Sequence, residues 1–223
     1  MSTLEATPVQ EWRAKDLEAY VGKLSAPSKM PGHAYSLPAW ECITGSKLQQ
    51  VPGSVCFDCY ALKGRNRFPV VKDAQYRRLA SLERPLWVDC MAELIRRKGD
   101  SHHRWHDAGD LQSLEHLRRI VEVCEQTPEV WHWLPTREYR LVTDYEDRYG
   151  PFPANLNVRA SAHMVDGPAP TFRKHPDLTV STVSTGPAPA GAHRCPASQQ
   201  GNSCGDCRAC WQRSVRHVDY PKH

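Results

Sequence analysis

Residues 103–124 read HRWHDAGDLQSLEHLRRIVEVC, and this stretch decides the fold class because it joins the end of a strand to an amphipathic helix. Its apolar side chains recur at steps of three and four, at Leu111, Leu114, Leu117, Val121 and Cys124. Charged residues occupy the positions between them, so the period predicts a helix with one buried stripe. The polar run HDAGD at residues 106–110 stands where the preceding strand would end.

The same alternation of strand and helix extends along most of the chain. Further strands are predicted at residues 33–40, 130–134, 156–162 and 178–183. Further helices are predicted at residues 9–24, 72–82 and 85–98, with a short helix or turn at 144–149. Strands that alternate with helices through short connections are typical of a parallel sheet with right-handed crossovers. The sequence therefore predicts an α/β fold.

Composition divides the 223 residues into three parts. Residues 1–30 are predicted to form an N-terminal helix and a linker. Residues 31–185 would form the parallel sheet and carry a first metal centre. A link rich in proline, alanine and glycine then leads into residues 186–223, which are predicted to form a cysteine-rich, metal-binding tail.

Seven of the nine cysteines fall in two groups, and the first group comprises Cys42, Cys56 and Cys59. The thirteen residues after Cys42 contain Gly45 and Pro52, so we expect a loop that folds back on itself. Thiolates are the preferred ligands of zinc and of iron–sulfur clusters. A structural zinc site would require a fourth ligand, whereas a [4Fe–4S] cluster held by three thiolates leaves one iron open for a substrate or cofactor.

The second cysteine group lies in the tail and comprises Cys195, Cys204, Cys207 and Cys210. Four thiolates can close a tetrahedral zinc site or fill a cubane cluster completely. The C-x2-C-x2-C run resembles a ferredoxin more than a zinc ribbon, which favours a second cluster and leaves zinc as the alternative. A third alternative makes one tail cysteine the fourth ligand of the first centre. Cys90 and Cys124 lie on apolar helix faces and are predicted to be core residues.

Polar side chains follow the predicted strands where each strand ends. Because the carboxyl ends of parallel strands share one edge of a sheet, we expect these side chains to converge. Asp107 and Asp110 flank Gly109, and two acids at a strand end are costly to bury without a partner, which favours a functional role. One of them alternatively caps the following helix. Arg137 either pairs with Glu138 or binds a carboxylate or phosphate.

The ending CFDC at residues 56–59 and the polar strand ends together resemble the radical S-adenosylmethionine enzymes. In that family three cysteines after the first strand hold a [4Fe–4S] cluster, whose open iron binds the amino and carboxylate groups of S-adenosylmethionine. The resemblance implies a partial parallel (β/α) barrel with a cysteine-rich C-terminal extension. It also implies reductive cleavage of S-adenosylmethionine, which starts radical chemistry on an unknown substrate, with a nucleotide or DNA base as one candidate.

The resemblance assigns roles to residues at the strand ends. The predicted catalytic residues are His106, Asp107, Asp110 and Arg137. The predicted contacts to S-adenosylmethionine are Asp107, Gly109, Asp110, Thr136 and Ser161. The implied partners are a small-molecule or nucleotide substrate and a reductant such as flavodoxin or ferredoxin.

A narrower resemblance rests on the elements CFDCYA at residues 56–61 and HDAGD at residues 106–110. Both are similar to elements of a family of small cysteine-rich bacteriophage proteins of the gene product 88 kind. This resemblance covers roughly residues 30–211. It implies a phage-encoded protein in the host cytoplasm but no particular substrate.

Composition leaves a second function open. The formal net charge of +4 permits contact with nucleic acid, so the alternative is a zinc- or cluster-stabilised binding module for nucleic acid or protein, without catalysis. Trp105, Trp131 and Trp133 are predicted to be core residues at alternate strand positions and not a base-stacking platform. We expect a cytoplasmic protein without a membrane partner, because no apolar run is long enough to span a bilayer and residues 1–12 do not resemble a secretory signal.

Overall fold

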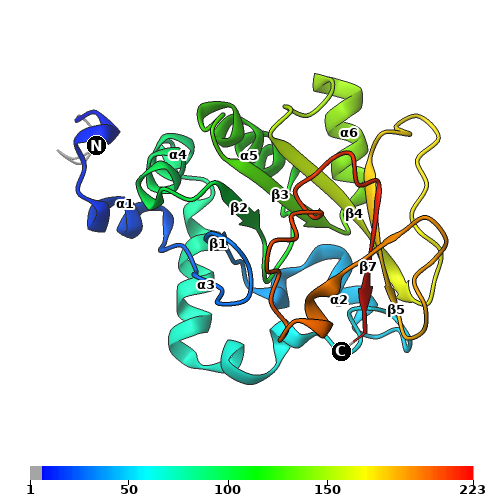
Figure 1. The fold of residues 1–223 in the computed structure, drawn as a ribbon. Coiled ribbons are helices and arrows are strands. Elements are labelled where there is room, and N and C mark those ends of the chain that lie inside the picture. The colour runs from blue at the N-terminus through cyan, green and yellow to red at the C-terminus, as the bar shows by residue number, and fades with distance from the viewer. Residues whose placement is uncertain (1–6, 223) are drawn as a thin grey trace.

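The computed structural model describes residues 7–222 and contains one seven-stranded sheet in the order β1-β2-β3-β4-β5-β7-β6 (Figure 1). The strands are β1 (Ala34–Tyr35), β2 (His102–Trp105), β3 (Trp131–Thr136), β4 (Leu156–Val165), β5 (Thr179–Ser184), β6 (His193–Arg194) and β7 (His217–Pro221). Every neighbouring pair is parallel, which confirms the α/β class. Within the described residues no pairing joins β1 to β6, so hydrogen bonds do not close the sheet and the partial barrel is not confirmed.

Helices cover one face of this sheet. The α-helices are α1 (Ala14–Val21), α2 (Ile43–Leu48), α3 (Pro69–Ser81), α4 (Trp87–Lys98), α5 (Leu114–Gln126) and α6 (Tyr139–Tyr149). The 3-10 helices are η1 (Val9–Glu11), η2 (Ala39–Glu41), η3 (Tyr60–Leu62), η4 (Gly64–Arg67) and η5 (Pro196–Gln199). α1 packs on α4, α4 on α5 and α5 on α6, and these neighbours form a continuous layer (Figure 1).

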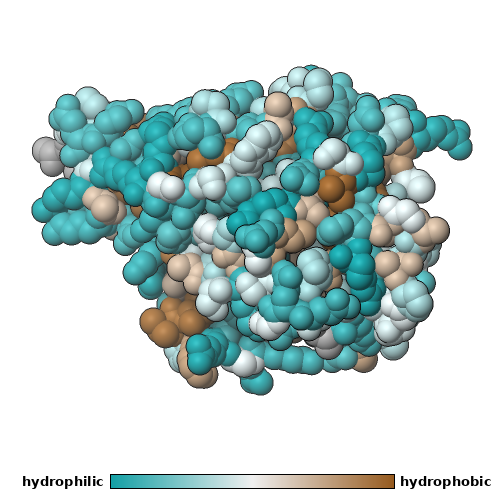
Figure 2. Space-filling view, in the orientation of Figure 1, coloured by the Kyte–Doolittle hydropathy of each residue, from teal (hydrophilic) through white to brown (hydrophobic). Residues whose placement is uncertain are grey.

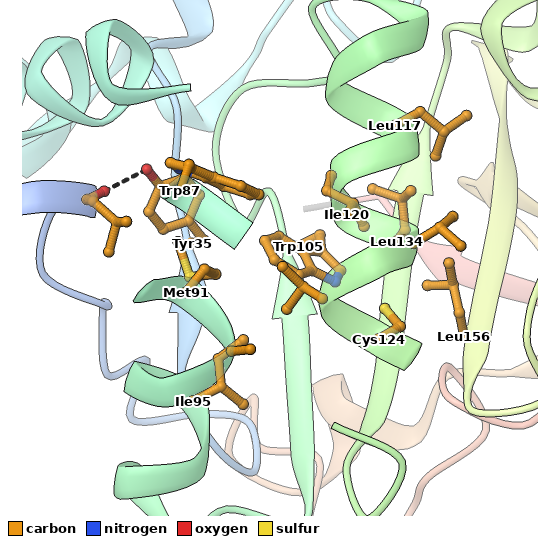
Figure 3. Packing of buried hydrophobic residues seen from close by; sticks show 14 of the residues in the cluster. Tyr35, Trp87, Met91, Ile95, Trp105, Leu117, Ile120, Cys124, Leu134 and Leu156 are labelled. Atoms are coloured by element: carbon orange, nitrogen blue, oxygen red, sulfur yellow. Dashed lines mark hydrogen bonds between the residues drawn. The ribbon is translucent and has the colours of Figure 1, made fainter. Parts of the chain in front are cut away.

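The apolar core lies between this helical layer and the sheet (Figure 3). Tyr35, Trp87 and Trp105 are fully buried at its centre, and the Tyr35 hydroxyl donates a 2.6 Å hydrogen bond to the carbonyl of Val21. Cys90 of α4 and Cys124 of α5 are also fully buried in this cluster. Their prediction as core residues is therefore confirmed.

Three local predictions were wrong. Residues 43–48 form helix α2 and not a loop. The first strand is confined to Ala34–Tyr35, because the chain then turns to pair the Leu37 amide with the carbonyl of Ala108 at 2.8 Å. The helix predicted at residues 9–24 is divided into η1 and α1, and the six residues before Thr7 lie outside the described chain.

The tail adds two strands that the sequence did not predict. β7 lies between β5 and β6, so the end of the chain belongs to the same sheet as the first metal-centre region. Buried Asp219 holds β7 in place, since it accepts hydrogen bonds from Thr182 Oγ1 at 2.6 Å and Ser184 Oγ at 2.7 Å and also binds Arg194. The tail is thus attached to the sheet by backbone pairing and by a buried carboxylate.

The surface is mostly hydrophilic on the side shown in Figure 2. Exposed Phe68 and Val70 contribute apolar surface at the start of α3. Residues 7–222 contain no helix that is both long and apolar enough to cross a membrane.

Candidate metal centres

The first cysteine group gathers around Gly45 of α2. A Cβ atom added at Gly45 would lie 3.5 Å from Cys42 Sγ and 3.7 Å from Cys56 Sγ. It would also lie only 2.8 Å from Cys42 Cβ, closer than side chains pack. Two thiols that are separated by thirteen residues in the sequence therefore lie beside the same glycine.

Backbone pairing brings the cysteine loop to the sheet. Ser54 forms an antiparallel bridge with Met164 at the end of β4, and the Val55 amide donates a 2.8 Å hydrogen bond to the carbonyl of His163. Cys59 follows in a turn, and together with Cys42 it packs against a small cluster of alanines, Ala39, Ala61 and Ala108. The three cysteines thus meet beyond the carboxyl ends of β1, β2 and β4.

Glu138, at the end of β3, fixes the start of α2. Its two carboxylate oxygens accept 2.8 Å hydrogen bonds from the Thr44 amide and the Thr44 hydroxyl. Glu138 is buried, so these bonds are screened little by water. One alternative predicted from the sequence was an ion pair between Arg137 and Glu138. In the structure the Glu138 carboxylate binds Thr44 instead.

Arg137 points its side chain toward the end of β4, where Nε donates a 3.3 Å hydrogen bond to the carbonyl of Ala162. Burial raises the pKa of the Cys56 thiol, and the positive charge of Arg137 opposes this rise. Burial, together with the charges of Asp110 and the other two cysteines, also raises the pKa of Cys42. Arg137 is therefore a cation that favours the thiolate form of Cys56.

Asp110 is a buried anchor between β2 and β3. One carboxylate oxygen accepts hydrogen bonds from Thr136 Oγ1 at 2.6 Å and from the Leu111 amide at 2.8 Å, and the other accepts from the Arg137 amide at 2.9 Å. Burial raises its pKa to about 6, against the lowering effect of these bonds. It does not cap α5, which begins at Leu114 with Ser113 accepting from the His116 amide.

Asp107 is the more accessible of the two predicted acids. Its side chain accepts a hydrogen bond from Ser36 Oγ, and its carbonyl accepts one from the hydroxyl of Tyr60, which follows Cys59 directly. Asp107 is only partly buried, whereas Asp110 is buried. Asp107 thus connects the first cysteine group to the turn after β2.

The other predicted site residues take different positions. The His106 ring is buried, has its pKa lowered by burial and lies edge-on against His116 of α5 at 5.2 Å between ring centroids. Its catalytic role stays a prediction. Thr136 Oγ1 donates to Asp110, and Ser161 Oγ accepts a 3.1 Å hydrogen bond from Ser181, so both hydroxyls have partners within the protein.

Gly109 allows the turn after β2 to touch the end of β1. Its φ is +83°, and an added Cβ would lie 2.6 Å from Leu37 Cβ and 2.7 Å from the Leu37 carbonyl oxygen. Gly109→Ala is expected to lower the free energy of unfolding by at least about 3 kcal/mol, because strain and overlap add. Urea unfolding measures this change.

Gly99→Ala is the matched control for this substitution. Gly99 also has a positive φ, +70°, but nothing lies within 4 Å of its added Cβ. The control should therefore lose only about 1 kcal/mol for the left-handed backbone. Equal losses in the two variants would show that the contact with Leu37 does not matter.

The second cysteine group is assembled by the tail and by distant backbone. The Cys195 amide donates to the carbonyl of Asp219 and the Cys204 amide to that of Lys29, both at 2.8 Å. The neighbouring Cys195 and Cys207 thiols contribute to the raised pKa of Cys204, after burial. Burial also raises the pKa of Cys210 to about 11, with a contribution from Cys195.

Two polar side chains lie against these thiols. Cys207 Sγ is 3.5 Å from His193 Nε2, and Cys210 Sγ is 3.1 Å from the Tyr220 hydroxyl. The four tail thiols thus have one another as neighbours, while Cys42 and Cys56 have Cys59 as theirs. This grouping does not support a tail cysteine as a ligand of the first centre.

Two arginines that sequence reasoning missed face the tail group. Arg159 of β4 is fully buried and donates to the carbonyls of Val180 at 2.8 Å, Val215 at 2.9 Å and Ala209 at 3.2 Å.

The second arginine is Arg104 of β2, whose guanidinium lies 4.5 Å from the centre of the Trp133 ring. Across residues 7–222 neither arginine forms an ion pair with a carboxylate. Both interact electrostatically with Cys210. The sequence signal that could have revealed Arg159 is a charged residue inside the predicted strand LNVRASA, residues 156–162.

The thiols are neighbours but do not form a finished site for a single ion. Within the described part of the chain, no three or more His, Cys, Asp or Glu side chains are arranged as ligands of one metal ion.

Comparison with known proteins identifies the family. No curated protein and no solved structure matches the chain. A family model described as gene product 88 matches residues 9–213, which supports the narrower resemblance and gives no support to the wider one with radical S-adenosylmethionine enzymes. Because this match spans most of the 223 residues, the chain belongs to the gene product 88 family.

Proposed function

We propose that this member of a bacteriophage family is an iron–sulfur enzyme of the radical S-adenosylmethionine type. Cys42, Cys56 and Cys59 would hold a [4Fe–4S] cluster with one iron open to S-adenosylmethionine. The observation that carries the proposal is the meeting of three thiols at the carboxyl edge of a parallel sheet, two of them facing Gly45. The substrate would be a small molecule, with a nucleotide or DNA base as one candidate.

The donor set suits a cluster better than a single zinc ion. A zinc ion draws four ligands to about 2.3 Å from one point, whereas the thiolates of a cubane bind different irons and stand farther apart. The first group offers three thiols, one fewer than the four ligands of a structural zinc site, whereas three thiolates can hold a cubane. The missing Cβ at Gly45 lets α2 approach Cys42 closely, so that two of the sulfurs lie beside the same glycine.

The surrounding residues would position and balance this centre. Glu138 holds α2 through Thr44, Asp110 ties the ends of β2 and β3 together, and Arg137 brings a positive charge toward Cys56. Asp107 is the acid we assign to the amino group of S-adenosylmethionine, because charge-assisted hydrogen bonds to an ammonium group are strong. When bound, the two cofactors would supply the radical chemistry, with electrons from a flavodoxin or ferredoxin.

The tail would hold a second centre, closed by Cys195, Cys204, Cys207 and Cys210. Four thiolates around a divalent metal ion leave a net negative charge, and the same holds for a cubane core of charge +2. Arg104 and Arg159 both interact electrostatically with Cys210, so their positive charges match a negative centre. Arg104 also interacts with the carboxylate of Asp107. We favour a second cluster, with zinc as the alternative metal.

Metal analysis of anaerobically purified protein tests the proposal against its rival. An iron–sulfur enzyme should be brown and should contain iron and acid-labile sulfide. A zinc-stabilised binding module should be colourless, with zinc in stoichiometric amounts. Iron, sulfide and zinc per chain, together with the visible spectrum, decide between these functions.

A further inference from the structure

A cavity of about 560 Å³ opens at the amino ends of β2 and β3, against the tail. Its wall includes His102, Trp131, Arg208, Trp211, Gln212 and Arg213. This volume lies within the usual range of about 300 to 1,000 Å³ for small-molecule pockets. The first cysteine group lies beyond the opposite, carboxyl ends of the strands, so the cavity is a separate site.

The aromatic wall of this cavity has one fixed ring and one exposed ring. Trp211 is 2% exposed, its Nε1 donates a 2.8 Å hydrogen bond to the carbonyl of His103, and its ring packs edge-on against His102 and Trp133. Trp131 is 49% exposed, which shows that its prediction as a core residue was wrong. The cavity is therefore bordered by one exposed indole ring, that of Trp131.

The charged wall of the cavity is entirely basic. Arg213 Nη1 donates to the carbonyl of Phe152 at 3.2 Å, and Arg208 Nη1 donates to the carbonyls of Gly205 at 2.6 Å and Cys207 at 2.9 Å. These bonds orient each guanidinium and engage only Nη1. No Asp or Glu lines the cavity. Arg213 also interacts electrostatically with Glu146 of α6, outside the lining of the cavity. The other N–H groups of each fork suit an anion such as phosphate.

We propose that this cavity binds a nucleotide unit, with its base stacked on Trp131 and its phosphate held by Arg208 and Arg213. Aromatic stacking combined with arginine contacts to phosphate is the usual basis for binding unpaired nucleotides. The unit is either a free nucleotide or one residue of a single strand. Arg208 also lines a smaller cavity of about 210 Å³ beside Lys29, so basic groups continue beyond the first cavity. The site does not depend on the proposed radical chemistry.

Binding measurements on the metal-loaded protein test this site with two probes, dAMP by calorimetry and a fluorescein-labelled deoxyadenylate dodecamer by anisotropy. Trp131→Ala should weaken binding about tenfold, the usual effect of losing one stacking partner. Arg213→Gln should weaken binding of the dodecamer and reduce its logarithmic salt slope by about 0.7, the value for one phosphate contact on a single strand. Binding of dAMP identifies a free nucleotide as the ligand, and binding of the dodecamer alone identifies a strand.

Two exposed residues elsewhere serve as controls. Phe68→Ala removes another exposed ring, and Arg140→Gln removes another exposed arginine, so both should bind the probes as the unaltered protein does. Circular dichroism shows whether each variant is folded. The proposal is overturned if neither probe binds, or if folded Trp131→Ala and Arg213→Gln proteins keep full affinity.

Discussion

Cys56→Ala is expected to remove most of the iron from the first cysteine group and to abolish any activity that depends on it. The Cys56 thiol lies beside Gly45 with that of Cys42, and the two-residue spacing to Cys59 leaves no other sulfur in the turn to replace it. Cys59→Ala should behave in the same way. Iron and sulfide per chain, measured after anaerobic purification, report the loss.

Cys90→Ala and Cys124→Ala are the matched controls. Both thiols are fully buried in the helical layer, and Figure 3 shows Cys124 within the apolar packing of α5. Removing either sulfur leaves a small cavity but no empty ligand position. If the iron content of these variants fell as far as that of Cys56→Ala, our division into ligand and core cysteines would be wrong.

Gly45→Ala tests whether the close packing around the first cysteine group matters when all three cysteines are kept. The substitution keeps all three cysteines, but its methyl group would lie 2.8 Å from Cys42 Cβ and beside two sulfurs. Alanine also favours a helix over glycine by about 1 kcal/mol, so α2 itself gains propensity. We therefore expect a fall in iron content, because the methyl group would crowd Cys42. Full iron content would show that the close approach of α2 to Cys42 is not needed.

Arg159→Met is expected to lower the free energy of unfolding by about 4 kcal/mol, because hydrogen bonds from a charged donor contribute about 1.5 to 3 kcal/mol each and several carbonyls would lose this donor. Those acceptors include the carbonyls of Val180, Ala209 and Val215, which connect β5 to the tail. The tail centre would lose a facing cation as well. Urea unfolding of the metal-loaded protein measures the change.

Arg140→Met is the control for this substitution. The Arg140 side chain is 91% exposed and pairs only with Asp144 one turn along α6. Its loss should change the stability by less than about 0.5 kcal/mol. A loss below about 1 kcal/mol in Arg159→Met would show that other contacts hold the tail to the sheet.

The local sequence pattern was enough to predict the elements whose buried residues recur at a regular spacing. The stripe from Leu114 to Cys124 predicted α5 because one helix face packs against the sheet, and alternation of strands and helices predicted the parallel sheet. The expectation that polar residues after the strands lie at one edge of the sheet followed from this parallel topology. Gly109 could be placed in the turn after β2, but its contact with Leu37 depends on a strand far away in the sequence.

Long-range contacts decided the elements that sequence reasoning missed. α2 contains glycine and looks like a loop, yet Glu138 from β3 stabilises its first turn through Thr44. β7 carries Asp219, which is tolerated in a buried strand because Thr182 and Ser184 of β5 and Arg194 of β6 bind it. Trp131 fits a strand pattern, but it stands at the open amino end of β3 beside a cavity.

The amino-group partner of S-adenosylmethionine provides a further prediction. Asp107→Asn should weaken the response of the protein to S-adenosylmethionine while keeping its iron, because an amide lacks the charge that favours an ammonium group. Asp144→Asn, on the outer surface of α6, should leave both properties unchanged. Equal responses in the two variants would remove Asp107 from the proposed site.

The electron paramagnetic resonance spectrum of the reduced protein, recorded with and without S-adenosylmethionine, tests the central claim most directly. Our account predicts an iron–sulfur signal that changes when S-adenosylmethionine is added, because the cofactor would bind the open iron of the cluster held by Cys42, Cys56 and Cys59. An iron–sulfur signal that is indifferent to S-adenosylmethionine, or a colourless protein containing zinc in place of iron, would contradict it.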